Sequence, residues 1–254
     1  LPYGIEARFL RGRRYVLNFD DDVWIKYEGR GRLADKYDRL VAGACGVVCA
    51  NDLLLEKVLK LNPDAVKIPT AVDLDAFPLQ AEKFPRFTVA WIGTPVTYSY
   101  LERHAEALRA MSRAAEFELL VIAKKSLGPR AVPGVRMRFE EWSPENEAAL
   151  LSRCHAGIMP LPADDAFAAG KSAFKLIQYL AAGLPAIASP VRVLRAGETG
   201  FFASAPGEWA EALRLLADDA VRIRLSANAR SLARDYSIQK YGPIYAEFLR
   251  EALE

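Results

Sequence analysis

The sequence predicts an α/β fold made of two parallel-sheet domains. Short apolar runs of strand type alternate with helical stretches along most of the 254 residues, and this alternation is typical of parallel sheets covered by helices. A turn-rich segment, residues 69–78, interrupts the pattern and is interpreted as an interdomain linker. The predicted domains are residues 1–76 and 77–254.

The first domain contains three short strand candidates separated by two helices. The strands are expected at residues 14–19, 46–50 and 66–68, and the helices at 33–44 and 52–61. Asn51 is a suitable cap for the second helix, and the Asn62-Pro63 pair should stop it.

The second domain is more regular. Strands are expected at residues 87–93, 117–123, 135–139, 156–160 and 186–189. One helix should follow the first strand and end at about residue 115, and another should run from Ser143-Pro144 to 153. Further helices are expected over 171–182 and over 206–253, the latter with breaks near Asp218 and Ser237. Ligands of such sheets bind at the carboxyl ends of the strands, where helix N-termini point into the crevice. Two such units should enclose a cleft.

The composition argues against several classes of protein. A net charge of +2 does not fit a nucleic-acid-binding surface. No signal peptide is recognised, and the longest apolar run, residues 40–50, is too short to span a membrane. Three cysteines in apolar stretches, Cys45, Cys49 and Cys154, are expected to be reduced thiols of a cytoplasmic protein rather than disulfide or zinc ligands.

The segment around residue 170 has the pattern of a phosphate site. Gly170 follows a strand and a loop of small residues and opens a helix, so backbone N–H groups can face an anion. Lys171 is expected in the first turn and Lys175 one turn later on the same face, which favours a pyrophosphate. Gln178 could hydrogen-bond a ribose diol. The alternative is that both lysines are solvated surface charges and Gln178 is an ordinary polar residue.

The same segment imitates a P-loop, ending in Gly170-Lys171-Ser172. Asp165 stands where that motif needs its first glycine, and a carboxylate there repels phosphate. An ATPase or kinase is therefore disfavoured. The only two histidines, His104 and His155, lie in no nucleophile–base arrangement and are expected to be structural.

Five stretches of the chain resemble, in collinear order, segments of the group 1 glycosyltransferases, which have the GT-B fold. They read NFDDDVW with CANDLLLEKV, IPTAVDLDAF, VAWIGTPVTYSYL, VRMRFEEWSPENEAALLSRCHAGIMPLP and GKSAFKLIQYLAAGLPAIASPV. The last is similar to the donor-site helix of the subset whose helix opens with Gly-Lys.

The resemblance implies two Rossmann-like domains, with residues 77–254 binding a nucleotide diphosphate-sugar. Residues 1–76 would be the C-terminal part of a truncated acceptor-side domain, on which the last helix would pack. The implied activity, in polysaccharide biosynthesis, is transfer of a hexose from that donor to a glycan or lipid-linked acceptor, retaining and without a cofactor. Peripheral membrane association is compatible with it. The alternative is a non-catalytic nucleotide-sugar binding or scaffold module.

Carried over residue by residue, the resemblance assigns the turn after the first strand, Gly93 and Thr94, to the diphosphate. The family's E-x7-E motif falls on Gly170 and Gln178, so both glutamates are missing. The family's Arg and Lys after the first strand fall on Thr94 and Ser99. Lys171 and Lys175 are the expected replacements for these two cations. The predicted donor-binding set is Gly93, Thr94, Gly170, Lys171, Ser172, Phe174, Lys175 and Gln178, and no catalytic residue is assigned.

A metal-dependent alternative rests on the acidic run Asp20 to Asp22, which contains the D-x-D pattern of the GT-A glycosyltransferases. A GT-A enzyme builds most of its nucleotide site before that motif, and here only 19 residues precede it. An acidic loop or a capped turn is the preferred interpretation, and no metal site is predicted.

Overall fold

The computed structural model describes residues 3–78, 80–128, 130–162, 173–191 and 193–254. They form two compact units. The first is built mainly from Leu1–Ala71 with Ile238–Glu254, and the second from Val72–Asp165 with Ala173–Ser237. None of the helices in the described part of the chain is long and apolar enough to cross a membrane.

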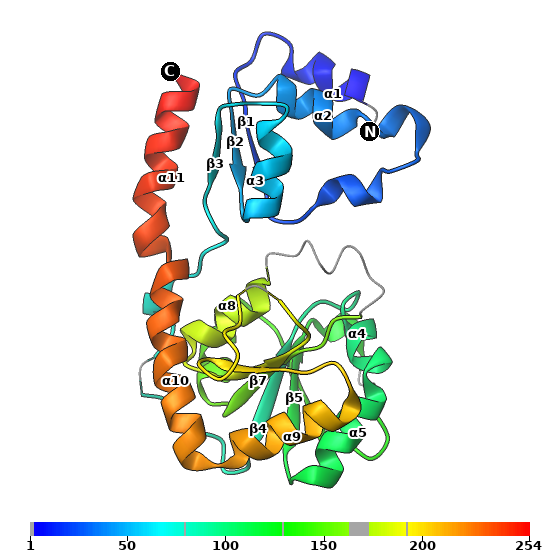
Figure 1. Cartoon of the computed structure of the whole chain (residues 1–254), viewed down its shortest axis with the longest axis vertical. Helices are drawn as coiled ribbons and strands as arrows, with labels where there is room; N and C mark the ends of the chain where they lie inside the picture. Colours follow the sequence, from blue (N-terminus) through cyan, green and yellow to red (C-terminus); the bar gives the residue numbers. More distant parts are fainter. Residues whose placement is uncertain (1–2, 79, 129, 163–172, 192) are drawn as a thin grey trace. The chain divides into compact units, whose positions relative to one another are not determined.

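The first unit contains a three-stranded parallel sheet in the order β1-β2-β3 (Figure 1). Its strands and helices are α1 (Tyr3–Leu10), β1 (Val16–Phe19), the 3-10 turns η1 (Val23–Lys26) and η2 (Gly31–Leu33), α2 (Lys36–Ala42), β2 (Gly46–Cys49), α3 (Asp52–Leu59) and β3 (Ala65–Lys67). Asn51 caps α3 as predicted, because its side chain accepts the Leu54 N–H at 3.0 Å. Helix α1 was not predicted.

The last helix, α11 (Ile238–Leu253), packs on the sheet of this first unit. A methyl group on Gly46 would lie 2.7 Å from the Phe248 ring, so the missing side chain lets the helix approach β2 closely. Arg14 also donates to the Ala252 carbonyl at 3.0 Å. A helix far away in sequence therefore completes the covering of a sheet formed near the N-terminus.

The second unit is a six-stranded parallel sheet in the order β6-β5-β4-β7-β8-β9. Its strands are β4 (Thr88–Ile92), β5 (Glu118–Ala123), β6 (Met137–Glu141), β7 (Ala156–Met159), β8 (Ala186–Ala188) and β9 (Gly200–Phe202). The chain runs outward from β4 to β6 and then returns to β7 on the other side of β4. The strand order therefore reverses between β4 and β7, which is where ligands of such sheets bind.

Helices cover this sheet, with α5 packed against α9 and α8 against α10 (Figure 1). The helices and 3-10 turns of the unit are η3 (Leu74–Ala76), α4 (Tyr98–Arg103), α5 (Ala105–Ala114), η4 (Lys125–Leu127), α6 (Glu147–Ser152), α8 (Phe174–Ala181), α9 (Pro206–Ala217), α10 (Asp219–Ala233) and η5 (Arg234–Tyr236). The predicted α/β class with parallel sheets is confirmed, and so are the breaks near Asp218 and Ser237.

Three predicted helix starts are wrong. Helix α2 begins at Lys36 rather than at Leu33, which belongs to the 3-10 turn η2. Helix α6 begins at Glu147 rather than at Pro144, because Ser143 and Asn146 exchange hydrogen bonds in a turn that precedes the helix. Helix α8 begins at Phe174, since Ala173 adopts a left-handed conformation with φ 54° and ψ 35°. Lys175 therefore lies in the first turn of α8, and not one turn later.

Candidate nucleotide-binding site

The turn after β4 lies at the carboxyl edge of the sheet, beside the reversal in strand order. A methyl group on Gly93 would lie 2.4 Å from the Trp91 ring and 2.8 Å from the Thr97 hydroxyl, so this position requires glycine. Thr94 and Thr97 hold the turn through reciprocal hydrogen bonds, in which the Thr94 N–H donates to Thr97 Oγ1 at 3.1 Å and the Thr97 N–H donates to Thr94 Oγ1 at 3.3 Å. The predicted Gly93-Thr94 element is thus a compact, ordered turn.

Helix α8 brings Lys175 to this turn. The Lys175 ammonium donates to Thr97 Oγ1 at 3.3 Å and lies 4.7 Å from the centre of the Trp91 ring. The structure therefore brings together three of the predicted residues, Gly93, Thr94 and Lys175. A fixed positive charge in the first turn of a helix, beside a strand-end turn, is suited to a diphosphate.

Tyr179 anchors α8 at the reversal point. Its hydroxyl accepts the Ile92 N–H of β4 at 3.2 Å and donates to the Ile158 carbonyl of β7 at 3.1 Å. A methyl group on Gly157 would lie 2.5 Å from the Tyr179 ring, so glycine at this position makes room for the ring. Burial raises the pKa of Tyr179, so it stays neutral. Sequence reasoning missed this residue, although it follows Lys175 by four positions on the same helix.

Gln178 does not face the strand-end turn. It is 4% exposed, and its amide donates to Glu147 Oε1 at 2.5 Å, while Trp142 donates to Glu147 Oε2 at 2.5 Å. The Glu147 carboxylate is thus held next to the position where the family's second glutamate was expected. Glu147 was not among the predicted site residues because 31 residues separate it from Gln178. The only local signal was its place in the first turn of α6.

The remaining predicted residues divide into two groups. Phe174 is described and is 40% exposed at the start of α8. Gly170, Lys171 and Ser172 lie outside the described residues, as does the P-loop-like run 165–172.

A small cavity lies further along the same carboxyl edge, where β5 and β6 end. Its volume is about 230 Å³. It is lined by Val121, Ala123, Lys124, Lys125, Gly128, Phe139, Glu140 and Glu141. The Lys124 ammonium lies 5.9 Å from the centre of the Trp142 ring. The lining contains one aromatic side chain, two lysines and two glutamates.

The acidic run of the first unit is engaged with protein groups. Asp22 pairs with Lys57 at 3.0 Å and caps the Trp24 N–H, while Asp20 accepts from the Thr70 hydroxyl at 3.3 Å. Among the described residues, no group of three His, Cys, Asp or Glu side chains is placed to hold a metal ion. The geometry of Asp22 fits the interpretation of a capped turn.

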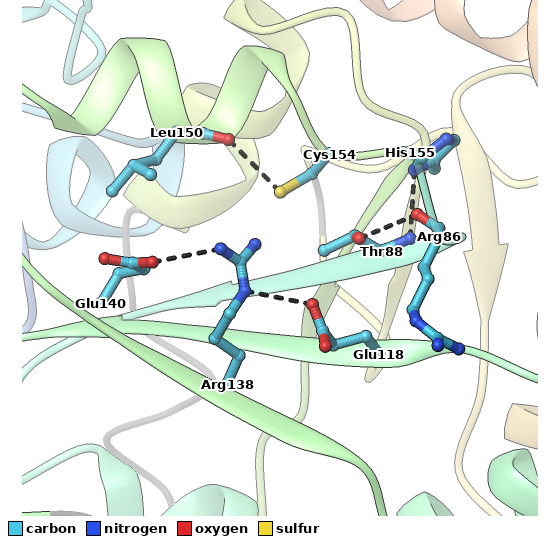
Figure 2. Close-up of polar contacts among 8 residues, drawn as sticks. All are labelled: Arg86, Thr88, Glu118, Arg138, Glu140, Leu150, Cys154 and His155. Carbon is cyan, nitrogen blue, oxygen red and sulfur yellow. Dashed lines mark hydrogen bonds and ion pairs between the residues drawn. The ribbon is translucent and has the colours of Figure 1, made fainter. Parts of the chain in front are cut away.

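Both histidines make structural contacts. His104 joins α4 to α5, with Nδ1 2.8 Å from the Tyr100 carbonyl oxygen, and burial lowers its pKa. Figure 2 shows His155 at the amino edge of the second sheet, where Nδ1 accepts the Thr88 N–H at 3.0 Å. Burial, with the cations of Arg222 and Lys83 nearby, lowers the pKa of His155 to about 4.

The cysteines are free thiols. Burial raises the pKa of Cys49 to about 11 and that of Cys154 to about 12, so neither is a thiolate at neutral pH.

Solved structures of glycosyltransferases have the same fold over nearly the whole chain. The pneumococcal O-GlcNAc transferase GtfA, in complex with UDP and GlcNAc, matches 99% of this chain with a TM-score of 0.69 and 11% identity. HepE of Anabaena, in complex with UDP and glucose, matches 97% with a TM-score of 0.72 and 13% identity. TarM matches 97% with a TM-score of 0.71 and 9% identity. The fold is therefore of the GT-B type.

This chain spans 55% of the length of GtfA, 74% of HepE and 53% of TarM. No curated protein sequence matches it. The sequence profile of the glycosyl transferases group 1 matches residues 74–219, which is more than half of the chain and contains the strand-end turn, α6 and α8. The chain belongs to the glycosyl transferases group 1 family.

Proposed function

We propose that the second unit binds a nucleotide diphosphate-sugar and that the protein transfers a hexose from it to a glycan or lipid-linked acceptor, with retention and without a metal. The observation that carries the proposal is the Lys175 ammonium, held on the ordered turn at the reversal point of the sheet. There it would neutralise the diphosphate, whose negative charge grows as the sugar leaves. Because HepE and GtfA are in complex with UDP, UDP is the first ligand to test.

The Glu147 carboxylate is the proposed acceptor for the ribose hydroxyls. Its oxygens each receive one hydrogen bond, from Gln178 and from Trp142, and a carboxylate oxygen can accept a second. Gln178 would position this carboxylate instead of binding the diol itself. The missing second glutamate of the family motif would then be replaced by a carboxylate from α6.

We expect Glu147→Ala to weaken UDP binding by about 1.5–3 kcal/mol, the cost of losing a charged hydrogen bond. Isothermal titration calorimetry with UDP and with its 2′,3′-dideoxy analogue measures this. The analogue should bind the wild type and the variant with similar affinity, since it lacks the hydroxyls. Glu145→Ala, two positions earlier and exposed, is the matched control. Equal loss of affinity for UDP and its analogue would assign Glu147 a purely structural role.

Binding of UDP is expected to be independent of divalent metal. The Asp22 carboxylate is already paired with Lys57, and the proposed phosphate site uses lysine. Titrations with excess chelator should give the same affinity as those without it. A loss of affinity that manganese restores, and that Asp20→Ala with Asp22→Ala abolishes, would move the nucleotide site to the acidic run.

A second candidate function is a nucleotide-sugar binding module without turnover. It is favoured by the replacement of both glutamates of the family motif by Gly170 and Gln178. Sugar release from UDP-hexoses, followed by chromatography with and without added glycan, distinguishes the two. Binding without any release or transfer would favour the module.

A further inference from the structure

A second cavity of the second unit lies at the opposite edge of the sheet. Its volume is about 440 Å³. The lining residues are Pro78, Lys83, His155, Ala182, Gly183, Arg222, Ile223, Ser226, Ala227 and Arg230. His155 directly precedes β7 and Gly183 follows α8, whereas Lys175 lies at the other end of α8. This helix has 8 residues and is about 12 Å long, so the cavity is separate from the proposed donor site.

The lining is cationic and, among the residues named above, contains no carboxylate. Arg222, Ser226 and Arg230 follow one another at intervals of four along α10, so they lie on one face of the helix. Arg222 is paired with Asp219. Lys83 and Arg230 bond only to backbone carbonyls among the described residues: Lys83 to Ser152 and Cys154, at 2.9 and 2.8 Å, and Arg230 to Ala181, Leu74 and Phe77.

His155 adds a neutral donor to this lining. Because Nδ1 accepts the Thr88 N–H (Figure 2), the proton of the neutral ring must be on Nε2. No described residue accepts a hydrogen bond from that second nitrogen. The charged groups that face the ring are Lys83, Arg222 and Asp219, and the Phe87 ring lies 5.3 Å away.

The mutual effects of these groups indicate an excess of positive potential. The cations of Lys83 and Arg222 contribute to lowering the pKa of His155, and Arg222 contributes to lowering that of Lys83, in each case after burial. The pKa of Arg230 is lowered by burial and by Arg234, whereas the Asp75 carboxylate raises it. An anion in the cavity would relieve this repulsion.

The geometry points to a second ligand site in this cavity, for a phosphate-class oxyanion held by Arg222, Arg230, Lys83 and the Nε2–H of His155. The proposal is independent of the donor site. The anion can be free phosphate or the phosphoryl group of a small organic molecule.

His155 is a direct probe, since the protein has only two histidines. We expect inorganic phosphate to shift the His155 imidazole signals in NMR spectra and to raise the pKa of His155, while the signals of His104 stay in place. Glucose 1-phosphate binding more tightly than phosphate would identify an organic ligand. Equal affinity for chloride would reduce the site to unspecific charge attraction and overturn the proposal.

A carboxylate introduced into the cavity should compete with the anion. We expect Ser226→Glu and Ala227→Glu to raise the dissociation constant for phosphate by about tenfold or more, equivalent to about 1.4 kcal/mol. Ser231→Glu, on an exposed position of the same helix outside the cavity, is the matched control and should bind phosphate normally.

The two sites are distinguished by testing each variant with both ligands. Ser226→Glu should leave UDP binding unchanged, and Lys175→Ala should leave the phosphate response of His155 unchanged. Absence of any His155 response in the wild type, or an unchanged response in both cavity variants, would overturn the proposal whatever the outcome of UDP titrations. Circular dichroism melts confirm that each variant is folded.

Discussion

Replacing Lys175 with alanine is expected to weaken UDP binding by about 1.5–3 kcal/mol, the contribution of a charged hydrogen bond. The ammonium is held by Thr97 Oγ1 and the Trp91 ring, so in the proposed complex little side-chain entropy remains to be lost when a phosphate oxygen arrives. Combining it with Lys171→Ala should remove a comparable further contribution if that residue also contacts the diphosphate. Calorimetric titration with UDP measures both steps.

Two controls separate this role from a general effect of charge or stability. Arg113→Ala removes a positive charge from an exposed position of α5 and should leave the affinity unchanged. Denaturation of Lys175→Ala reports the loss of the contact with Trp91, which is worth about 0.5–1 kcal/mol at an exposed site and more when desolvated. UDP should also raise the melting temperature of the wild type far more than that of the double variant. Unchanged affinity in the double variant would remove α8 from the nucleotide site.

Gly200→Ala is expected to destabilise the protein by about 3 kcal/mol or more, at the upper end of the cost of overpacking. Gly200 pairs with Ala186 where β9 adds to β8, and its φ is 158°. A methyl group there would lie 2.0 Å from the Ala186 carbonyl oxygen and 2.8 Å from its nitrogen. These are backbone atoms, so no side-chain rotation relieves the contact, and β9 must separate from β8.

Gly207→Ala is the matched control for this substitution. Gly207 lies in the first turn of α9, and a methyl group there meets no heavy atom within 4 Å. Alanine should be neutral or stabilising by up to about 1 kcal/mol, because it lowers the entropy of the unfolded chain. Guanidinium unfolding followed by tryptophan fluorescence measures both variants. Equal stability of Gly200→Ala and wild type would show that the β8–β9 pairing differs from the one described.

Most strands were predictable because each is a short apolar run bounded by turn residues, as in Leu119–Ala123 or Ala186–Ala188. Strand β9 (Gly200–Phe202) was missed, since it begins with a glycine and follows a turn that contains Gly197, a pattern typical of a loop. Helix α8 was recognised but started too early, because the sequence Lys171-Ser172-Ala173-Phe174 has no residue that forbids a helix. Ala173 has a left-handed backbone, so α8 begins after it, and alanine carries no sequence signal for that conformation.

The sequence by itself determined the α/β class, because hydrophobic period and turn residues are readable within a few positions, and its motifs carry the family resemblance. Lys175 was nominated from local charge and spacing, and Gly93 and Thr94 were nominated from the resemblance. The contacts of the site were decided by the tertiary structure. Strand order sets which strand ends are neighbours, and it places Lys175 against Thr97, 78 residues apart, and Glu147 against Gln178, 31 residues apart. No local pattern encodes such pairs, because they form only when β4 and β7 pair in the sheet.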